Sequence, residues 1–141
     1  MRALSVSPVW AWCILHGGKD IENRFWPYAP KFRGQFLIHA GLNVREDDLG
    51  TATRMLQVAN PSLTIPSIPN LPRGGLAGVA TLVDVQLNRP DEPKSPWEIP
   101  GHFGFVLADV KAFPEVMPWK GAQSFFHVPD TVAQELLRGL P

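Results

Sequence analysis

The segment PVWAWCILHGGKDIENR, residues 8–24, decides how this chain begins to fold. Ser7 precedes it as a candidate N-cap, and Pro8 occupies the first helical position, which proline favours. The residues that follow are apolar on all sides, so we predict a buried helix that ends at Gly17, a natural C′ residue. Residues 19–25 should then be extended. A buried helix leading into Lys-x-x-Glu-x-Arg predicts the wall of a small polar pocket.

Strand and loop patterns alternate through the rest of the chain. The predicted strands comprise residues 4–6, 34–40, 75–85, 103–110 and 124–128. An amphipathic helix is predicted over residues 47–59, and Asp130 should cap a last helix that ends near Arg138. Prolines punctuate the loops at 60–73 and 88–100. Because regular helices do not separate the strands, we predict an α+β fold, a small and mostly antiparallel β-barrel with flanking helices.

Length and composition restrict the class of protein. The 141 residues suit a single domain over residues 1–141. The one cysteine, Cys13, rules out a disulfide within the chain and a multi-cysteine zinc site, and we interpret it as a small buried hydrophobe. No apolar run approaches the roughly 18 residues of a membrane span, and no signal peptide is evident at the start. We therefore predict a cytoplasmic protein with no membrane partner.

The sequence contains no pattern typical of a metal or cofactor site. The four histidines lack metal-ligand spacing, and neither a P-loop nor a dinucleotide glycine motif is present. His39 and His127 lie on predicted strands, where we interpret them as hydrogen-bonded barrel residues. We predict no metal and no cofactor.

Charge is unevenly distributed along the chain. The formal net charge is zero, which argues against non-specific coating of nucleic acid. Residues 1–45 nevertheless carry six Lys and Arg against two acids, whereas residues 46–141 carry seven against eleven. A locally basic first third fits a nucleotide-sized anion or a short single strand better than a long duplex.

The order of short motifs along the chain resembles the ASCH domains, a family of the PUA-like superfamily. The matching segments are Leu4-Ser5, Pro8, Ala11, residues 17–24, Trp26, Arg33-Gly34, residues 38–40, 78–80 and 82–84, Pro96-Trp97, residues 103–107, Lys120-Gly121 and residues 126–129. The resemblance implies a PUA-like barrel, with a cleft between the barrel and the N-terminal helix. It also implies binding of RNA, single-stranded nucleic acid or a modified nucleoside. Some members resemble amidohydrolases acting on N4-acylated cytidine, and ribonuclease activity is ascribed to others.

Three charged residues are the first candidates for the site. Lys19 could hold a phosphate or act as a base, and Glu22 could accept from a base amino group or take a proton. Arg24 could hold a phosphate or carboxylate bidentately. In an extended segment Glu22 and Arg24 share a face and should form an ion pair, while Lys19 points away unless the glycines before it re-aim the side chain. The structural alternative is a salt bridge that only braces the barrel opening.

A catalytic role for the same residues lacks the nucleophile that the resemblance would supply. In the amidohydrolase-like members a threonine three residues after the lysine is the nucleophile, but Glu22 occupies that position here. Covalent acyl transfer is therefore not expected. Water attack assisted by Glu22 or Asp84, with Lys19 stabilising the developing negative charge, remains a catalytic hypothesis. Asp84 ends a predicted strand at the family's third acidic position, and its alternative role is that of a turn residue.

Aromatic side chains could supply the stacking half of a nucleoside site. We select Trp26, Trp97 and Phe103 as candidate ligand-binding residues. Trp97 is the first choice because it sits in a proline-rich loop, where we expect an exposed ring. Trp10 and Trp12 are assigned to the core. The leading hypothesis is a binding domain for RNA or a modified nucleoside. A hydrolase using the same cleft and a protein-interaction adaptor with a vestigial cleft are the alternatives.

Overall fold

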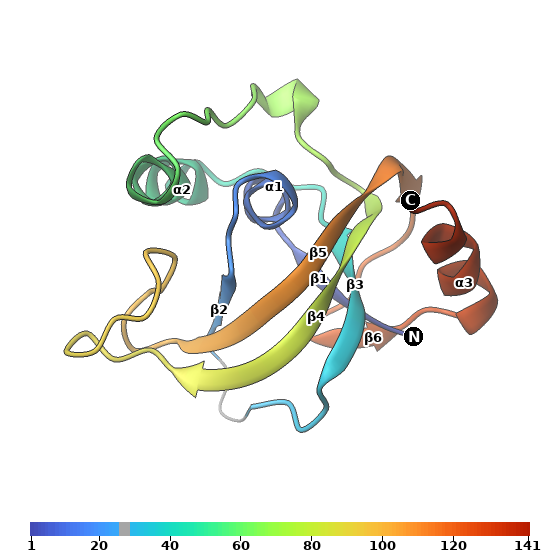
Figure 1. Ribbon diagram of the computed structural model, residues 1–141. Coiled ribbons are helices and arrows are strands. Elements are labelled where there is room, and N and C mark those ends of the chain that lie inside the picture. Colours follow the sequence, from blue (N-terminus) through green and yellow to red (C-terminus); the bar gives the residue numbers. More distant parts are fainter. Residues whose placement is uncertain (26–28) are drawn as a thin grey trace.

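The computed structural model describes residues 1–25 and 29–141, which form an α+β fold (Figure 1). In chain order the elements are β1 (Arg2–Val6), α1 (Pro8–His16), β2 (Ile21–Arg24), β3 (Gly34–Ala40), α2 (Glu46–Ala59), a short 3₁₀ helix (Ile68–Asn70), β4 (Gly75–Leu87), β5 (Phe103–Pro118), β6 (Phe125–His127) and α3 (Asp130–Arg138). Trp26, one of the predicted ligand-binding residues, lies outside the described residues.

The strands form one curled sheet in the order β2-β5-β4-β3-β1-β6. Strands β1 and β3 run parallel, and the other neighbours are antiparallel. The long β4 and β5 curve through the middle of the molecule (Figure 1), and their register shifts at three places. Such bulges bend and twist a sheet. In the described part of the chain no ladder joins β2 to β6, so the sheet is an open half-barrel rather than a closed barrel.

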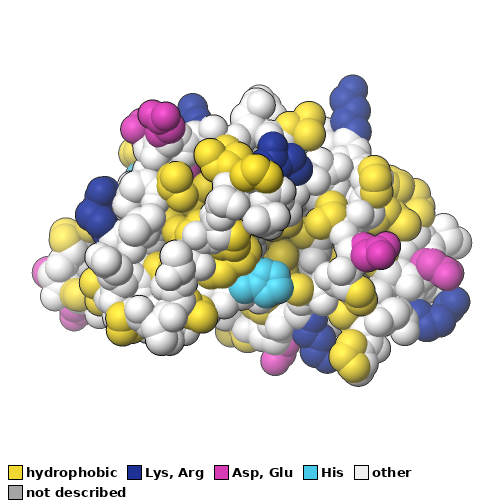
Figure 2. All heavy atoms as spheres, turned by 90° about the horizontal axis from the view of Figure 1, so that it is seen from above, with side chains coloured by type: hydrophobic (Ala, Val, Ile, Leu, Met, Phe, Trp, Pro, Cys, Tyr) yellow, Lys and Arg dark blue, Asp and Glu magenta, His cyan; other side chains and the backbone are white. Residues whose placement is uncertain are grey.

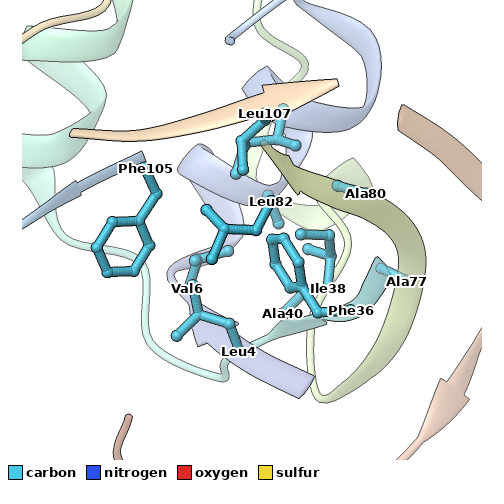
Figure 3. Packing of buried hydrophobic residues seen from close by; sticks show 12 residues of the cluster. Leu4, Val6, Phe36, Ile38, Ala40, Ala77, Ala80, Leu82, Phe105 and Leu107 are labelled. Carbon is cyan, nitrogen blue, oxygen red and sulfur yellow. The ribbon is translucent and has the colours of Figure 1, made fainter. Parts of the chain in front are cut away.

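The two faces of this sheet carry separate cores because successive side chains of a strand alternate between faces. Leu4, Phe36 and Ile38 belong to a cluster that packs under α1, where they point toward Leu82 and other neighbours (Figure 3). Their sequence neighbours, among them Leu37, belong to a second cluster that α3 covers. The helix α1 is therefore sandwiched between the sheet and α2, which leaves its N-terminal end at the edge of the barrel.

Close contact between α1 and the sheet depends on a glycine. A Cβ atom at Gly78 would lie 2.3 Å from Leu15 Cδ2 and 2.6 Å from Lys111 O. The strand can therefore accept the helix only where it lacks a side chain. The predicted burial of α1 is confirmed, since Val9 and Cys13 are both fully buried.

Several predicted boundaries are confirmed and others change. Strand β3 has the predicted bounds, whereas β4 and β5 each extend beyond the predicted end because they pair with one another along a long antiparallel ladder. Asp130 does not cap α3. It is the first residue of that helix, and its carboxylate accepts a hydrogen bond of 2.7 Å from the amino group of Met1.

Candidate functional site

A glycine turn between α1 and β2 directs Lys19 toward the site. The N–H groups of Gly17 and Lys19 both donate to Cys13 O, at 2.9 and 3.0 Å. Gly17, the predicted C′ residue, has an ordinary φ of −102°, and it is Gly18 that adopts the left-handed φ of +76°. The turn therefore brings Lys19 to the same side as Glu22, as the sequence analysis allowed.

Lys19, Glu22 and Arg24 form one connected ion cluster. Lys19 Nζ lies 3.0 Å from Glu22 Oε1, and Arg24 Nε lies 3.1 Å from Glu22 Oε2. Lys19 also donates to Ile21 O, and Arg24 Nη2 donates to Ser5 O at 2.6 Å. The predicted Glu22–Arg24 ion pair is confirmed. Each oxygen of the carboxylate has its own cation, and Arg24 ties the cluster to β1.

Burial gives this cluster its electrostatic character. Lys19 is only 2% exposed and Glu22 only 5%. Burial alone would raise the pKa of Glu22, but the charges of Lys19 and Arg24 and their hydrogen bonds outweigh it and hold that pKa below its ordinary value. The carboxylate is therefore ionised at neutral pH and is a weak proton acceptor, which disfavours the predicted role of Glu22 as a base.

The lowered pKa of Glu22 makes the free energy of unfolding depend on pH in the acid range. A carboxyl group whose pKa is lower in the folded state contributes stability that is fully present above its unfolded value of 4.5 and is lost as the pH falls through its folded value. We expect urea denaturation between pH 7 and pH 3 to show this loss. In a Glu22→Gln variant the free energy of unfolding should decline less over this pH range. Parallel pH profiles for the two proteins would contradict the assignment of the loss to Glu22.

A cavity of about 500 Å³ opens beside the ion cluster. Four parts of the chain line it: the end of β1 with the first turn of α1, β2 with its flanking residues, the start of α2, and the loop before β5. Five charged side chains face it, three of them cations (Lys19, Arg24 and Arg45) and two of them carboxylates (Glu22 and Asp48). Their formal sum is +1, which favours a polar or anionic ligand. Arg45 and Asp48 were not predicted from the sequence.

Among the described residues, the Trp and Phe side chains that line the cavity are Trp10 and Phe25, not the predicted Trp97 and Phe103. Trp10, assigned to the core, is half-buried and lines the cavity, with its ring centroid 5.0 Å from Lys19 Nζ. Phe25 also lines it and is 80% exposed, and its ring centroid lies 4.4 Å from that of His102. Phe25 directly follows Arg24, so its place next to the charged motif was the available signal.

The expectation of an exposed Trp97 ring is wrong. Trp97 is 1% exposed and belongs to a core cluster with Val9, Cys13 and Ile21. Phe103 does not line the cavity either. It packs against the core beneath α1 and pairs with Arg24 across the β2–β5 ladder. Both residues support the site from behind and do not present a stacking surface.

Asp84 lies away from the candidate site. Its side chain is 66% exposed on β4, where it pairs with Arg33 at 3.5 Å and accepts from the N–H of Val85. It does not line the cavity, so the hypothesis of water attack assisted by Asp84 gains no geometric support.

The loop before β5 is held against β2 as a fixed wall of the cavity. Asn23 Oδ1 accepts from Asn88 Nδ2 at 2.8 Å and from the N–H of Ile99 at 2.9 Å, and Asn23 Nδ2 donates to Trp97 O at 2.9 Å. Asn23 sits between Glu22 and Arg24. One amide side chain thus fixes the proline-rich loop directly beside the ion cluster.

The two strand histidines have different environments. His39 is buried, and its Nε2 donates to Trp119 O at 2.7 Å. Nδ1 must then accept from the Ser5 hydroxyl at 2.9 Å, so His39 is a hydrogen-bonded barrel residue as predicted. His127 is instead exposed on the short edge strand β6.

Within residues 1–25 and 29–141, no three His, Cys, Asp or Glu side chains gather closely enough to hold a metal ion. No helix in those ranges has the length and hydropathy to cross a membrane. A scan against protein-family models matches none of them, and a search of curated protein sequences finds no match. The proposed function therefore rests on the geometry of the cavity.

Proposed function

We propose that the cavity binds RNA, or a modified nucleoside, with a base stacked on Phe25 and its polar edge near Glu22 and Arg24. The observation that carries the proposal is an exposed aromatic ring in one cavity with a buried carboxylate and its half-buried guanidinium partner. Proteins recognise unstacked bases by the same combination of a stacking face and edge hydrogen bonds. The volume of about 500 Å³ falls within the range of about 300–1,000 Å³ typical of small-ligand pockets.

We also propose that the half-barrel is a PUA-like fold of the ASCH type. Its support is positional. Residues 17–24 carry much of the sequence resemblance. Of the four charged residues in this segment, all except Asp20 line the cavity. A cleft between the sheet and the N-terminal helix is what the resemblance implies, and the end of β1 and the first turn of α1 form one wall of this cavity.

The charge distribution favours a short single strand or a single nucleoside over a duplex. On the face shown in Figure 2, the Lys and Arg side chains stand apart from one another and are separated by apolar and uncharged groups. A duplex binder needs a continuous basic surface to follow two phosphate backbones. Here the formal net charge is zero, and the cations of the cavity lie around one opening.

Binding is better supported than catalysis. Both oxygens of Glu22 are engaged by cations, and two N–H groups of Lys19 are donated to Glu22 and Ile21. Burial raises the pKa of the Cys13 thiol to about 12, so this thiol is not a nucleophile. The hydrolase alternative, acting on N4-acylated cytidine or on RNA, would need a base outside this cluster.

Replacing Phe25 with alanine should weaken binding of a short single-stranded RNA by about 1–3 kcal/mol, because base–aromatic stacking contributes that much. Fluorescence anisotropy with a labelled oligonucleotide measures the change. Val58→Ala is the matched control, since Val58 is 76% exposed on α2 and does not line the cavity. Thermal unfolding should be unchanged in both variants. Equal RNA affinity in Phe25→Ala and wild type would contradict the stacking role.

Mass spectrometry separates a binding domain from an enzyme. Wild type and Glu22→Gln are incubated with modified nucleosides, including N4-acylcytidine, and with short single-stranded RNAs. We expect every compound to be recovered unchanged. Any product formed by wild type would establish the hydrolase alternative and overturn the binding-only proposal, and loss of that product in Glu22→Gln would place the reaction in this cavity.

A further inference from the structure

Two buried polar atoms of the cavity have no hydrogen-bond partner among the described residues. Within the described residues, Ser7 Oγ and His102 Nδ1 are the buried side-chain nitrogen or oxygen atoms without a hydrogen bond. Both residues line the same cavity, one at the start of α1 and the other in the loop before β5. Most buried polar side-chain atoms in proteins are satisfied, so each exception needs an explanation. A polar ligand that reaches both walls would satisfy both atoms.

The wall that contains Ser7 is the N-terminus of α1. The first backbone hydrogen bond into this helix runs from the N–H of Ala11 to Ser7 O, at 2.9 Å. Pro8 has no N–H, so Val9 and Trp10 supply the remaining donors at this end. The Ser7 side chain caps none of them, and the first turn contains no acid. Unsatisfied N–H groups and the helix dipole together favour an anion here.

The cavity also has a cation outside the ion cluster of Lys19, Glu22 and Arg24. Arg45 lines the cavity and is exposed, and it forms no ion pair with a described residue. The first turn of α2, which follows Arg45, carries Glu46, Asp47 and Asp48, and Asp48 faces the cavity. These acids oppose an anion at the N-terminus of α2, whereas the first turn of α1 contains no acid. The charge of Glu22 is already balanced by its two cations.

We propose that the ligand carries an oxyanion, the phosphate of a nucleotide, bound at the N-terminus of α1 by the Ser7 hydroxyl, the N–H groups of Val9 and Trp10, and Arg45. This proposal rests on the proposed function and narrows it, because it selects a phosphorylated nucleotide over a free nucleoside. His102, on the opposite wall, then contacts the base or sugar beside Phe25.

The test is calorimetric titration with the four nucleosides, their 5′- and 3′-monophosphates, and inorganic phosphate. We expect at least one monophosphate to bind roughly tenfold more tightly than its nucleoside, as charge-assisted hydrogen bonds would give. Ser7→Ala should reduce that preference roughly three- to tenfold, and Arg45→Gln should reduce it as well. Because Ser7 Oγ forms no hydrogen bond with a described residue, thermal unfolding of Ser7→Ala should match wild type.

Matched controls are Ser62→Ala and Arg54→Gln, which change an exposed serine and an exposed arginine outside the cavity. Neither should alter the preference. Equal affinity for nucleosides and monophosphates would overturn the oxyanion site and leave the proposed function standing. An unchanged preference in both Ser7→Ala and Arg45→Gln would overturn its position at α1. No binding of any nucleoside, nucleotide or RNA would instead refute the proposed function.

Discussion

Replacing Glu22 with alanine should lower the free energy of unfolding by about 3–5 kcal/mol, the range found when one partner of a buried ion pair is removed. Glu22 is the only carboxylate within 4.0 Å of Lys19 among the described residues, and the Lys19 side chain is 1% exposed. Its ammonium would keep the carbonyl of Ile21 and the face of Trp10 but lose its counter-charge. Urea denaturation at pH 7, where Glu22 is ionised, measures the loss.

Asp84→Ala is the matched carboxylate control. Asp84 pairs with Arg33 at 3.5 Å on the surface, and exposed ion pairs contribute at most about 1 kcal/mol. A double variant, Lys19→Met with Glu22→Leu, should recover part of the loss because the fully buried Lys19 charge is removed together with its partner, and only the partly exposed Arg24 then loses its ion pair with Glu22. A loss below about 1 kcal/mol in Glu22→Ala would mean that Lys19 finds another counter-charge or reaches water.

Replacing Trp97 with alanine should cost about 3–5 kcal/mol of stability, as expected for truncating a large buried aromatic side chain. Trp97 belongs to the loop before β5 and is 1% exposed. Its ring packs in a cluster with Val9 and Cys13 of α1. The hydrogen bond from Asn23 to the backbone carbonyl of residue 97 can persist in this variant, so the cost comes from the lost packing of the ring. Thermal and urea unfolding measure the cost.

Phe25→Ala provides the opposite pattern, because the ring is 80% exposed. It should lose RNA affinity without losing stability, whereas Trp97→Ala should lose stability first. If Trp97→Ala kept its stability and lost only RNA affinity, Trp97 would be a stacking residue and its buried position would not represent the binding state.

The parts of the fold that the sequence predicts are those set by local rules. The start of α1 follows from Pro8 at its first position, although the predicted cap by the Ser7 side chain does not form, and β3 follows from a run of apolar residues between loop signals. The Glu22–Arg24 ion pair follows from the alternation of side chains along an extended segment. Each of these depends on residues that are near one another in the chain.

The parts that fail depend on distant segments. Asp84 follows a register shift between β4 and β5, so alternation along its own strand does not show where its side chain points. Trp97 is buried because Asn23, far away in the sequence, fixes the loop against β2. Likewise, Ser7 Oγ and His102 Nδ1 can be recognised as buried atoms without a described hydrogen-bond partner only in the folded structure.

The position of Cys13 makes the alkylation rate of its thiol a measure of local opening around α1. Cys13 is the one cysteine of the chain, it is fully buried on α1, and burial raises its pKa to about 12. Cys13 packs in a cluster with Leu56 of α2 and with Trp97, so alkylating reagents modify it only when α1 separates from α2 and from the loop that carries Trp97. The modification rate reports how often the helix opens. The start of α1 forms a wall of the cavity. Any molecule that binds there and favours the closed state therefore slows the alkylation of Cys13, whatever the identity of that molecule.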